Sequence, residues 1–178
     1  LHVEALTRPT LRDTFAYFDE HLHDSDYLVG WLDAFAKEPQ LGRSELHRGV
    51  MLAPGDDPAP EQTLRLESQQ LPDAVMGLIP NSVIWRFQRP FWNNLGMRFV
   101  NLGKFSAARL RDGSSYRQPH ALFHFLLDHF DWDKPFGPGG LIQYQPFIPA
   151  ANAEATFSEI LRLCQRRGLP NYLSVVKR

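Results

Sequence analysis

The stretch DYLVGWLDAFA, residues 26–36, decides the fold that the sequence predicts. It is rich in large apolar side chains, and we expect it to form a strand. Successive side chains of a strand point to opposite faces of a sheet, so this strand has two different faces. One face carries Tyr27, Val29, Trp31 and Asp33, and the other carries Leu28, Gly30, Leu32 and Ala34.

Helix and strand patterns alternate on both sides of this stretch. Upstream, TLRDTFAYFDEHLHD has a candidate N-cap at Thr10 and apolar residues at helical spacing, which predicts an amphipathic helix. Downstream, KEPQLGRS leads to a second strand at ELHRGVML. Near the C-terminus we expect a strand from Leu141 to Ile148, a helix with Asn152 as N-cap and Gly168 as its end, and a last strand in NYLSVVKR.

This order of elements predicts an α+β fold, with a mostly antiparallel sheet that helices cover on one face. A chain of 178 residues with 43% hydrophobic content can bury one core, so we expect a single domain over residues 1–178. The chain begins with Leu1 and ends at Arg178 inside a predicted strand. We therefore interpret it as part of a larger protein.

The charge balance limits the partners of this domain. The chain has 19 lysine and arginine residues against 20 aspartate and glutamate residues, a formal net charge of −1. No overall field attracts nucleic acid, so we expect no such partner, and membrane association is not indicated. The N-terminus lacks the pattern of a signal peptide and no apolar run has the length of a spanning helix, which leaves the cytoplasm as the default location.

The sequence offers little for metal or disulfide chemistry. Its single cysteine, Cys164, excludes an internal disulfide framework and a metal site built on several thiolates. Two histidine groups come into question as metal ligands, namely His124 with Asp128 and His129, and His21 with His23. Their spacing matches no standard zinc pattern, so we expect no metal site.

Two polar residues interrupt the apolar strand predicted near the C-terminus. Gln143 and Gln145 are two positions apart, so both amides project from the same face. If the last strand presents Lys177 on that face, the two amides and the ammonium lie beside Trp31 and form a binding wall. The alternative is a solvated face, because antiparallel sheets commonly leave one face in water.

Several of these segments together resemble a known family. GPGGLIQYQPFIP, the preceding FHFLLDHFDWDKPFG, the helix that follows and the closing YLSVVK are similar to the substrate-binding, or cap, region of FAD-linked oxidoreductases of the vanillyl-alcohol-oxidase type. The resemblance implies FAD as the cofactor, held mainly by a flavin-binding domain of the same protein that lies outside these 178 residues. It also implies that the sheet holds an alcohol, a sugar or a lipid-linked polyol, against the flavin while a hydride is transferred.

The resemblance assigns roles to individual residues. Lys177 and Gln145 match residues that line the family's substrate pocket, so we expect Lys177 to stabilise charge on the substrate oxygen and Gln145 to orient the substrate. His124 or a neighbouring phenylalanine stands where the family has a tyrosine. His124 could donate a hydrogen bond, act as a base or serve only as a core or rim histidine. These three are the predicted catalytic residues. The predicted substrate-binding residues are Trp31, Val29, Gln143 and Val175, with Gln143 supporting Gln145.

A second class of function stays open at the level of the sequence. The chain could be a free-standing α+β module that binds a ligand or another protein and catalyses nothing. The two hypotheses differ in the flanking sequence, because only the oxidoreductase needs a flavin domain around this segment.

Overall fold

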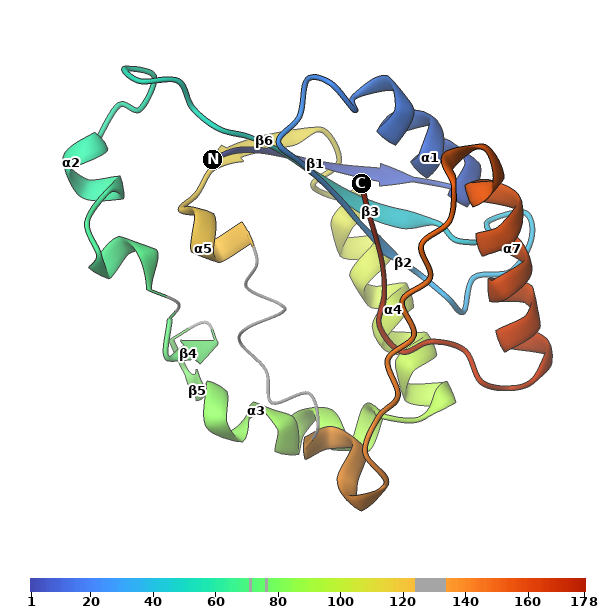
Figure 1. The fold of residues 1–178 in the computed structure, drawn as a ribbon. Helices are drawn as coiled ribbons and strands as arrows, with labels where there is room; N and C mark the ends of the chain where they lie inside the picture. Colours follow the sequence, from blue (N-terminus) through green and yellow to red (C-terminus); the bar gives the residue numbers. More distant parts are fainter. Residues whose placement is uncertain (71, 76, 124–133) are drawn as a thin grey trace.

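The protein, described here from a computed structural model, is built around one five-stranded sheet (Figure 1). The structure describes residues 1–70, 72–75, 77–123 and 134–178. The strand order across the sheet is β6-β1-β3-β2-β7, and every neighbouring pair is antiparallel. The strands are β1 (His2–Arg8), β2 (Tyr27–Leu32), β3 (Ser44–Val50), β6 (Ser114–Arg117) and β7 (Ser174–Lys177). A separate pair is formed by β4 (Ala74–Val75) and β5 (Ile79–Pro80).

Helices occupy most of the remaining described chain. No helix among the residues that the structure describes is long and apolar enough to cross a membrane. The α-helices are α1 (Leu11–Glu20), α2 (Pro60–Thr63), α3 (Asn81–Gln88), α4 (Asn94–Arg109), α5 (His120–Phe123) and α7 (Ala150–Arg166). Short 3-10 helices span Glu67–Gln69, Arg89–Phe91 and Lys134–Gly139.

The main hydrophobic core lies between the sheet and helices α1 and α7. It includes the residues Leu11, Tyr17, Phe18, Leu28, Leu32, Ala34, Leu41, Leu46, Leu161 and Val176. Gly30 is needed in this layer, since a Cβ atom there would lie 2.8 Å from the Leu46 side chain and 3.0 Å from that of Val176. The faces of β2 are those that its alternation predicts, because Leu28 and Leu32 point into this core.

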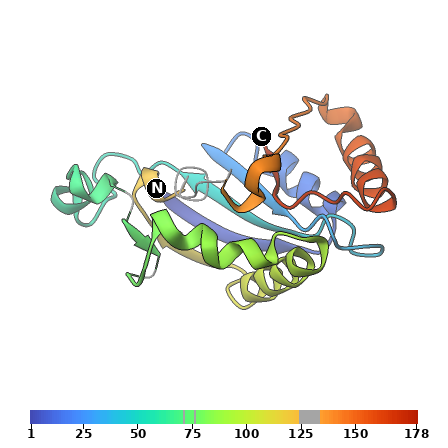
Figure 2. The same cartoon turned by 90° about the horizontal axis from the view of Figure 1, so that it is seen from below.

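A second helical layer covers the opposite face of the sheet. Helix α4 packs against β1 and β3, and Figure 2 shows α4 and α7 on opposite sides of the sheet. The side of α4 that packs there carries Met97, Asn101, Phe105 and Ala108 at helical spacing. The α+β class and the antiparallel sheet are confirmed, but helices cover both faces rather than one, because this apolar side of α4 also needs burial.

The strand predicted from Leu141 to Ile148 is wrong. This segment is non-helical chain that pairs with no strand among the described residues, and most of its side chains are exposed, Ile142 and Phe147 almost fully. The place beside β2 is taken by β7. Pro146 has no N–H to donate to a sheet, which disfavours this segment as a paired strand.

The ends of the predicted helices are partly confirmed. Thr10 caps α1, where its hydroxyl accepts a hydrogen bond from the backbone N–H of Asp13 at 3.2 Å. Gly168 follows α7 with φ of 69°, a conformation that favours glycine and ends the helix. The N-cap prediction for Asn152 is wrong, since α7 already begins at Ala150 after Pro149.

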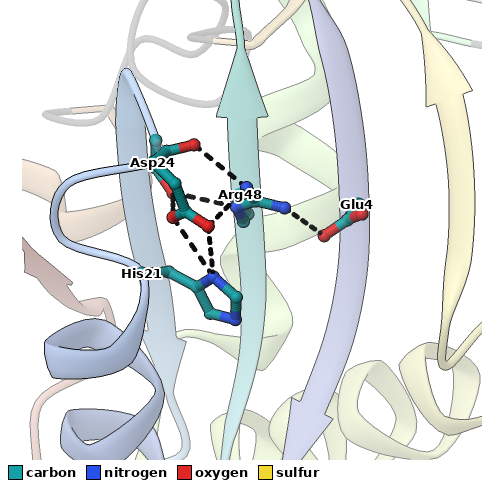
Figure 3. A network of polar contacts seen from close by, with 5 residues as sticks. Glu4, His21, Asp24 and Arg48 are labelled. Carbon is teal, nitrogen blue, oxygen red and sulfur yellow. Dashed lines mark hydrogen bonds and ion pairs between the residues drawn. The ribbon is translucent and has the colours of Figure 1, made fainter.

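A network of polar side chains ties the sheet together on the face that α1 covers (Figure 3). Arg48 on β3 donates to the Glu4 carboxylate on β1 at 3.0 Å and to the backbone carbonyl of Asp24 at 2.9 Å. The Asp24 carboxylate accepts a hydrogen bond from Nδ1 of His21 at 3.0 Å and lies 3.1 Å from Arg48. The network therefore joins two strands to the loop that follows α1.

This network predicts an acid-dependent part of the stability. The hydrogen bond from His21, supported by Ser25 and Arg48, lowers the pKa of Asp24. A carboxyl group with a lowered pKa stabilises the fold above its unfolded pKa of about 3.9, and this contribution is lost as the pH falls through the folded value. We expect Asp24→Asn to lower the urea midpoint at pH 7, and we expect its difference from the wild type to shrink as the pH falls below about 4.

The control for this prediction is Asp56→Asn. Asp56 lies in an exposed loop and its carboxylate makes no hydrogen bond or ion pair within the described part of the chain. Its replacement is expected to leave the urea midpoint unchanged at both pH values. A difference between Asp24→Asn and the wild type that stays constant from pH 7 to pH 3 would contradict the role of the Asp24 carboxylate.

Candidate functional site

Strand pairing places four of the predicted site residues together on one sheet face. In the register of β2 and β7, Val29 is opposite Lys177 and Trp31 is opposite Val175. The pairing of β2 with β3 then places His47 beside Val29 and Glu45 beside Trp31. Directly paired residues share a face, so these six residues form one surface, which we call the Trp31 face. It is the face on which α4 packs.

Glu45 is a buried carboxylate at the centre of a charged cluster on the Trp31 face. Its side chain is only 4% exposed. Nζ of Lys104, from α4, donates a hydrogen bond to one carboxylate oxygen. The other oxygen lies 3.6 Å from the Arg111 guanidinium and 3.7 Å from Nε2 of His47. The cations compensate the burial of the carboxylate, which would otherwise be costly.

Helix α4 covers one end of the Trp31 face. Nζ of Lys104 lies 4.8 Å from the centre of the Trp31 ring, a cation–π distance. The Trp31 side chain is buried under this contact. Lys104 therefore holds both the indole and the Glu45 carboxylate in place.

Helix α5 covers the other end of the same sheet face. The Tyr27 ring packs on Phe123 with 5.3 Å between ring centres, and the Tyr27 hydroxyl lies 2.8 Å from Nε2 of His120. A Cβ atom on Gly49 would lie 3.2 Å from the Phe123 ring, so the strand and this helix are in close contact. Between the two helices, the described residues leave the row of Lys177, Val29 and His47 partly open.

His47 is a polar group in this open row. Its side chain is 32% exposed. Burial lowers the pKa of His47, Lys104 and Arg111 lower it further, and Glu45 acts in the opposite direction. Loss of hydration penalises the charged imidazolium, so the imidazole is neutral at pH 7. A neutral imidazole can accept a proton from a ligand.

The structure brings together some of the predicted site residues and not others. Val29, Trp31, Val175 and Lys177 form one contiguous group, as β-strand alternation predicts. Gln143 and Gln145 lie in the exposed segment before α7 and make no hydrogen bond with any described residue. The two glutamines are therefore not on a strand of the sheet that carries Lys177. His124 lies outside the described residues.

Sequence reasoning missed Glu45, His47 and Lys104. The signal for the first two was present, because ELHRGV places two polar residues two positions apart on a strand expected next to β2. Lys104 carried no local signal, since its contact with Glu45 spans 59 residues of sequence. Only the packing of α4 on the sheet brings it to the site.

Metal-ligating residues do not gather in the part of the chain that the structure describes. Within those ranges, no group of three or more His, Cys, Asp or Glu side chains is arranged to hold a metal ion. Of the two histidine groups considered from the sequence, His21 bonds Asp24 in the network of Figure 3. The other, with His124, Asp128 and His129, lies outside the described residues.

The fold and the Trp31 face define an α+β domain with a polar, partly open sheet surface, and comparison with known proteins relates it to an oxidase. The chain is similar to the decaprenylphosphoryl-β-D-ribose oxidase of Mycolicibacterium smegmatis, with 29% identity over 160 residues. The match covers 85% of this chain and 31% of the relative, so the chain spans about a third of the relative's length. No family model matches the chain. The similarity to an oxidoreductase is confirmed at this level, and the vanillyl-alcohol-oxidase type and the cap assignment stay predictions.

Proposed function

We propose that this chain is the substrate-binding part of an FAD-dependent oxidoreductase that transfers a hydride from an alcohol to flavin. The observation that carries the proposal is the strand register that joins Val29, Trp31, Val175 and Lys177 on one face. The resemblance assigns Lys177, Trp31 and Val29 to the family's substrate pocket, and the strand register gives these three residues a common face with Val175. The similarity to an oxidase over most of the chain supports the same class of reaction.

The residues of the Trp31 face suit one wall of a flavin site. Val29 and Val175 offer aliphatic contact, and Val175 is exposed beside an exposed lysine. An apolar surface with a few polar groups is typical of sites that hold a small molecule against a cofactor. When bound, FAD would supply the two-electron acceptor, and by this proposal its nucleotide is held by a flavin-binding domain outside the 178 residues.

Within this proposal each residue of the face has a task. Lys177 donates a hydrogen bond to the substrate oxygen and stabilises negative charge that develops there. Its ammonium makes no hydrogen bond or ion pair with the described residues, so it is available to a ligand. Val29, Val175 and the edge of Trp31 restrict the position of the substrate. Gln145, supported by Gln143, keeps its proposed role as a residue that reaches the substrate from outside the sheet. His124, which lies outside the described residues, keeps its proposed role as a hydrogen-bond donor or base.

The substrate class follows from the same proposal. A hydroxyl compound, a sugar or a lipid-linked polyol, can accept a hydrogen bond from Lys177 and donate its own proton to a neighbouring base. The relative is named as an oxidase of decaprenylphosphoryl-β-D-ribose, which is a lipid-linked sugar. Decaprenylphosphoryl-β-D-ribose is therefore one of the alcohols to test as a substrate.

The proposal is tested by the absorbance of the full-length protein that contains this chain. Oxidised flavin absorbs near roughly 450 nm, and we expect this band in the purified protein and its loss on anaerobic addition of a substrate alcohol. The probes are decaprenylphosphoryl-β-D-ribose, octyl glucoside, D-ribose and glycerol. A purified protein without the flavin band, or one whose band none of these probes bleaches, would overturn the proposal.

Replacement of Lys177 gives a sharper prediction for the same site. A hydrogen bond from a charged donor contributes about 1.5–3 kcal/mol, so we expect Lys177→Met to lower kcat/KM by roughly 10- to 150-fold with unchanged flavin content. Lys37→Met is the matched control, because Lys37 is an exposed residue of the loop between β2 and β3 and is not one of the six residues of the Trp31 face. Unchanged kinetics of Lys177→Met would remove the lysine from the mechanism.

A further inference from the structure

The row of partly open residues on the Trp31 face contains two groups with complementary chemistry. Lys177 and His47 flank Val29 on either side, one from β7 and one from β3. Neighbouring strands lie about 4.8 Å apart, so the two residues are separated by about 10 Å across the sheet. A molecule of the size of a sugar ring, lying over Val29, can therefore contact an ammonium at one end and an imidazole at the other.

We propose that His47 is the base that accepts the hydroxyl proton of the alcohol, an inference that rests on the proposed function. The sequence offered only His124 as a possible base, and His124 is 77 positions further along the chain. The proposal rests on the position of the imidazole beside Val29, on its partial exposure and on its contact with Glu45.

The surroundings of His47 leave a ring nitrogen available. Nε2 faces Oε1 of Glu45 at 3.7 Å, which is an ion-pair distance but too long for a hydrogen bond. The carboxylate favours the ring proton on Nε2, so Nδ1 keeps its lone pair. The imidazole makes no hydrogen bond with any of the described residues, and Nδ1 is therefore the atom that accepts the substrate proton.

The charges that face His47 set its protonation state. They come from Glu45 on its own strand, Lys104 on α4, Arg111 after α4 and Lys177 on β7. Burial together with Lys104 and Arg111 lowers the pKa of His47, while Glu45 limits the shift. The imidazole is thus neutral before the reaction, and the Glu45 carboxylate stabilises the imidazolium that forms afterwards.

The step is balanced in atoms and electrons. The hydroxyl O–H bond breaks and its proton forms an N–H bond at Nδ1 of His47. The adjacent C–H bond breaks, and the flavin of the proposed function, when bound, would take up this hydrogen together with both electrons of the bond. The electron pair left by the O–H bond forms the second bond of the product carbonyl. Lys177 stabilises the oxygen while its negative charge develops.

The first test is the pH dependence of kcat/KM in the full-length flavoprotein. If neutral His47 is the base, kcat/KM of the wild type rises about tenfold per pH unit up to the pKa of His47 and is level above it. We expect His47→Gln to lower kcat/KM by about 100-fold or more and to abolish this acidic limb. The control is His23→Gln, since His23 is an exposed residue of the loop after α1.

The second test is an NMR titration of His47, which does not depend on catalytic turnover. It uses a variant of Arg111, a residue outside the hydrophobic core. The His47 signal is assigned in a ¹³C-histidine NMR spectrum of the same protein by its loss in His47→Gln, and it is titrated. We expect a midpoint below the ordinary histidine value of about 6.5. Arg111 is 67% exposed, so Arg111→Gln should fold normally and, by removing a cation, raise this midpoint.

The pH profile and the NMR titration together distinguish a failure of His47 as the base from a failure of the proposed oxidoreductase function. The acidic limb of kcat/KM and the NMR midpoint should move to higher pH together in Arg111→Gln. A midpoint that moves while the limb stays in place would overturn His47 as the base, and so would wild-type kcat/KM in His47→Gln. If no probe alcohol bleaches the wild-type flavin, the proposed function fails and the role of His47 fails with it.

Discussion

Replacement of Phe18 by alanine is expected to lower the free energy of unfolding by about 3–5 kcal/mol, the range for a large aromatic residue removed from a core. Phe18 is 1% exposed and lies on α1. Its ring packs edge to face on Phe15, with 6.4 Å between ring centres, and Phe15 in turn lies 5.7 Å from the ring of Phe157 on α7. The cavity would thus weaken the contact of both helices with the sheet.

Urea unfolding followed by circular dichroism measures this effect. Phe87→Ala is the matched control, since Phe87 on α3 is 61% exposed and its truncation should change the free energy of unfolding by less than about 0.5 kcal/mol. Equal losses in the two variants would mean that α1 does not pack on the sheet as the structure shows.

Removal of the Asp33 carboxylate is expected to lower the free energy of unfolding by a similar amount, because it breaks a buried ion pair. Asp33 and Arg43 have side chains only 2% and 13% exposed, and Nη2 and Nε of Arg43 lie 2.7 Å and 2.8 Å from Oδ2 of Asp33. Oδ1 accepts a hydrogen bond from the backbone N–H of Phe35 at 2.9 Å. Asp33→Ala leaves the guanidinium buried without its partner, which costs about 3–5 kcal/mol.

A double-mutant cycle distinguishes a lost ion pair from a lost side chain. Asp33→Ala and Arg43→Met should each destabilise the protein, whereas the double variant should be clearly more stable than the sum of the two losses predicts. The exposed pair Arg12 and Glu154 provides the control, because Glu154→Ala should cost no more than about 1 kcal/mol. Strict additivity at Asp33 and Arg43 would contradict the coupling.

The parts of the fold that could be predicted depend on local patterns. The alternation in β2 predicted which of its residues enter the core, and Thr10 and Gly168 marked helix ends through the backbone groups that they satisfy. Asp33 directly follows β2 and Arg43 directly precedes β3, so the pairing of these two strands brings the carboxylate and the guanidinium together.

The parts that could not be predicted depend on contacts between distant segments. β1 was missed although His2, Val3, Glu4 and Ala5 alternate between half-buried and buried positions. Its place in the sheet depends on pairing with β3, more than 30 residues further along the chain. LIQYQPFI has the local pattern of a strand, but pairing is decided by which segment reaches the edge of β2, and that segment is β7. The position of Lys104 at the site likewise follows only from the docking of α4.

Strand β3 separates residues that are neighbours in the sequence into two compartments of the molecule. Leu46 lies in the core and Arg48 belongs to the network of Figure 3. Glu45 and His47 lie on the Trp31 face. A shift of β3 by one residue against β2 would exchange the two sets and place a carboxylate and an imidazole among leucines. The length of the loop from residue 33 to residue 43 therefore sets the side of the sheet on which each of these side chains lies. In this way it decides whether the Trp31 face carries polar or apolar side chains.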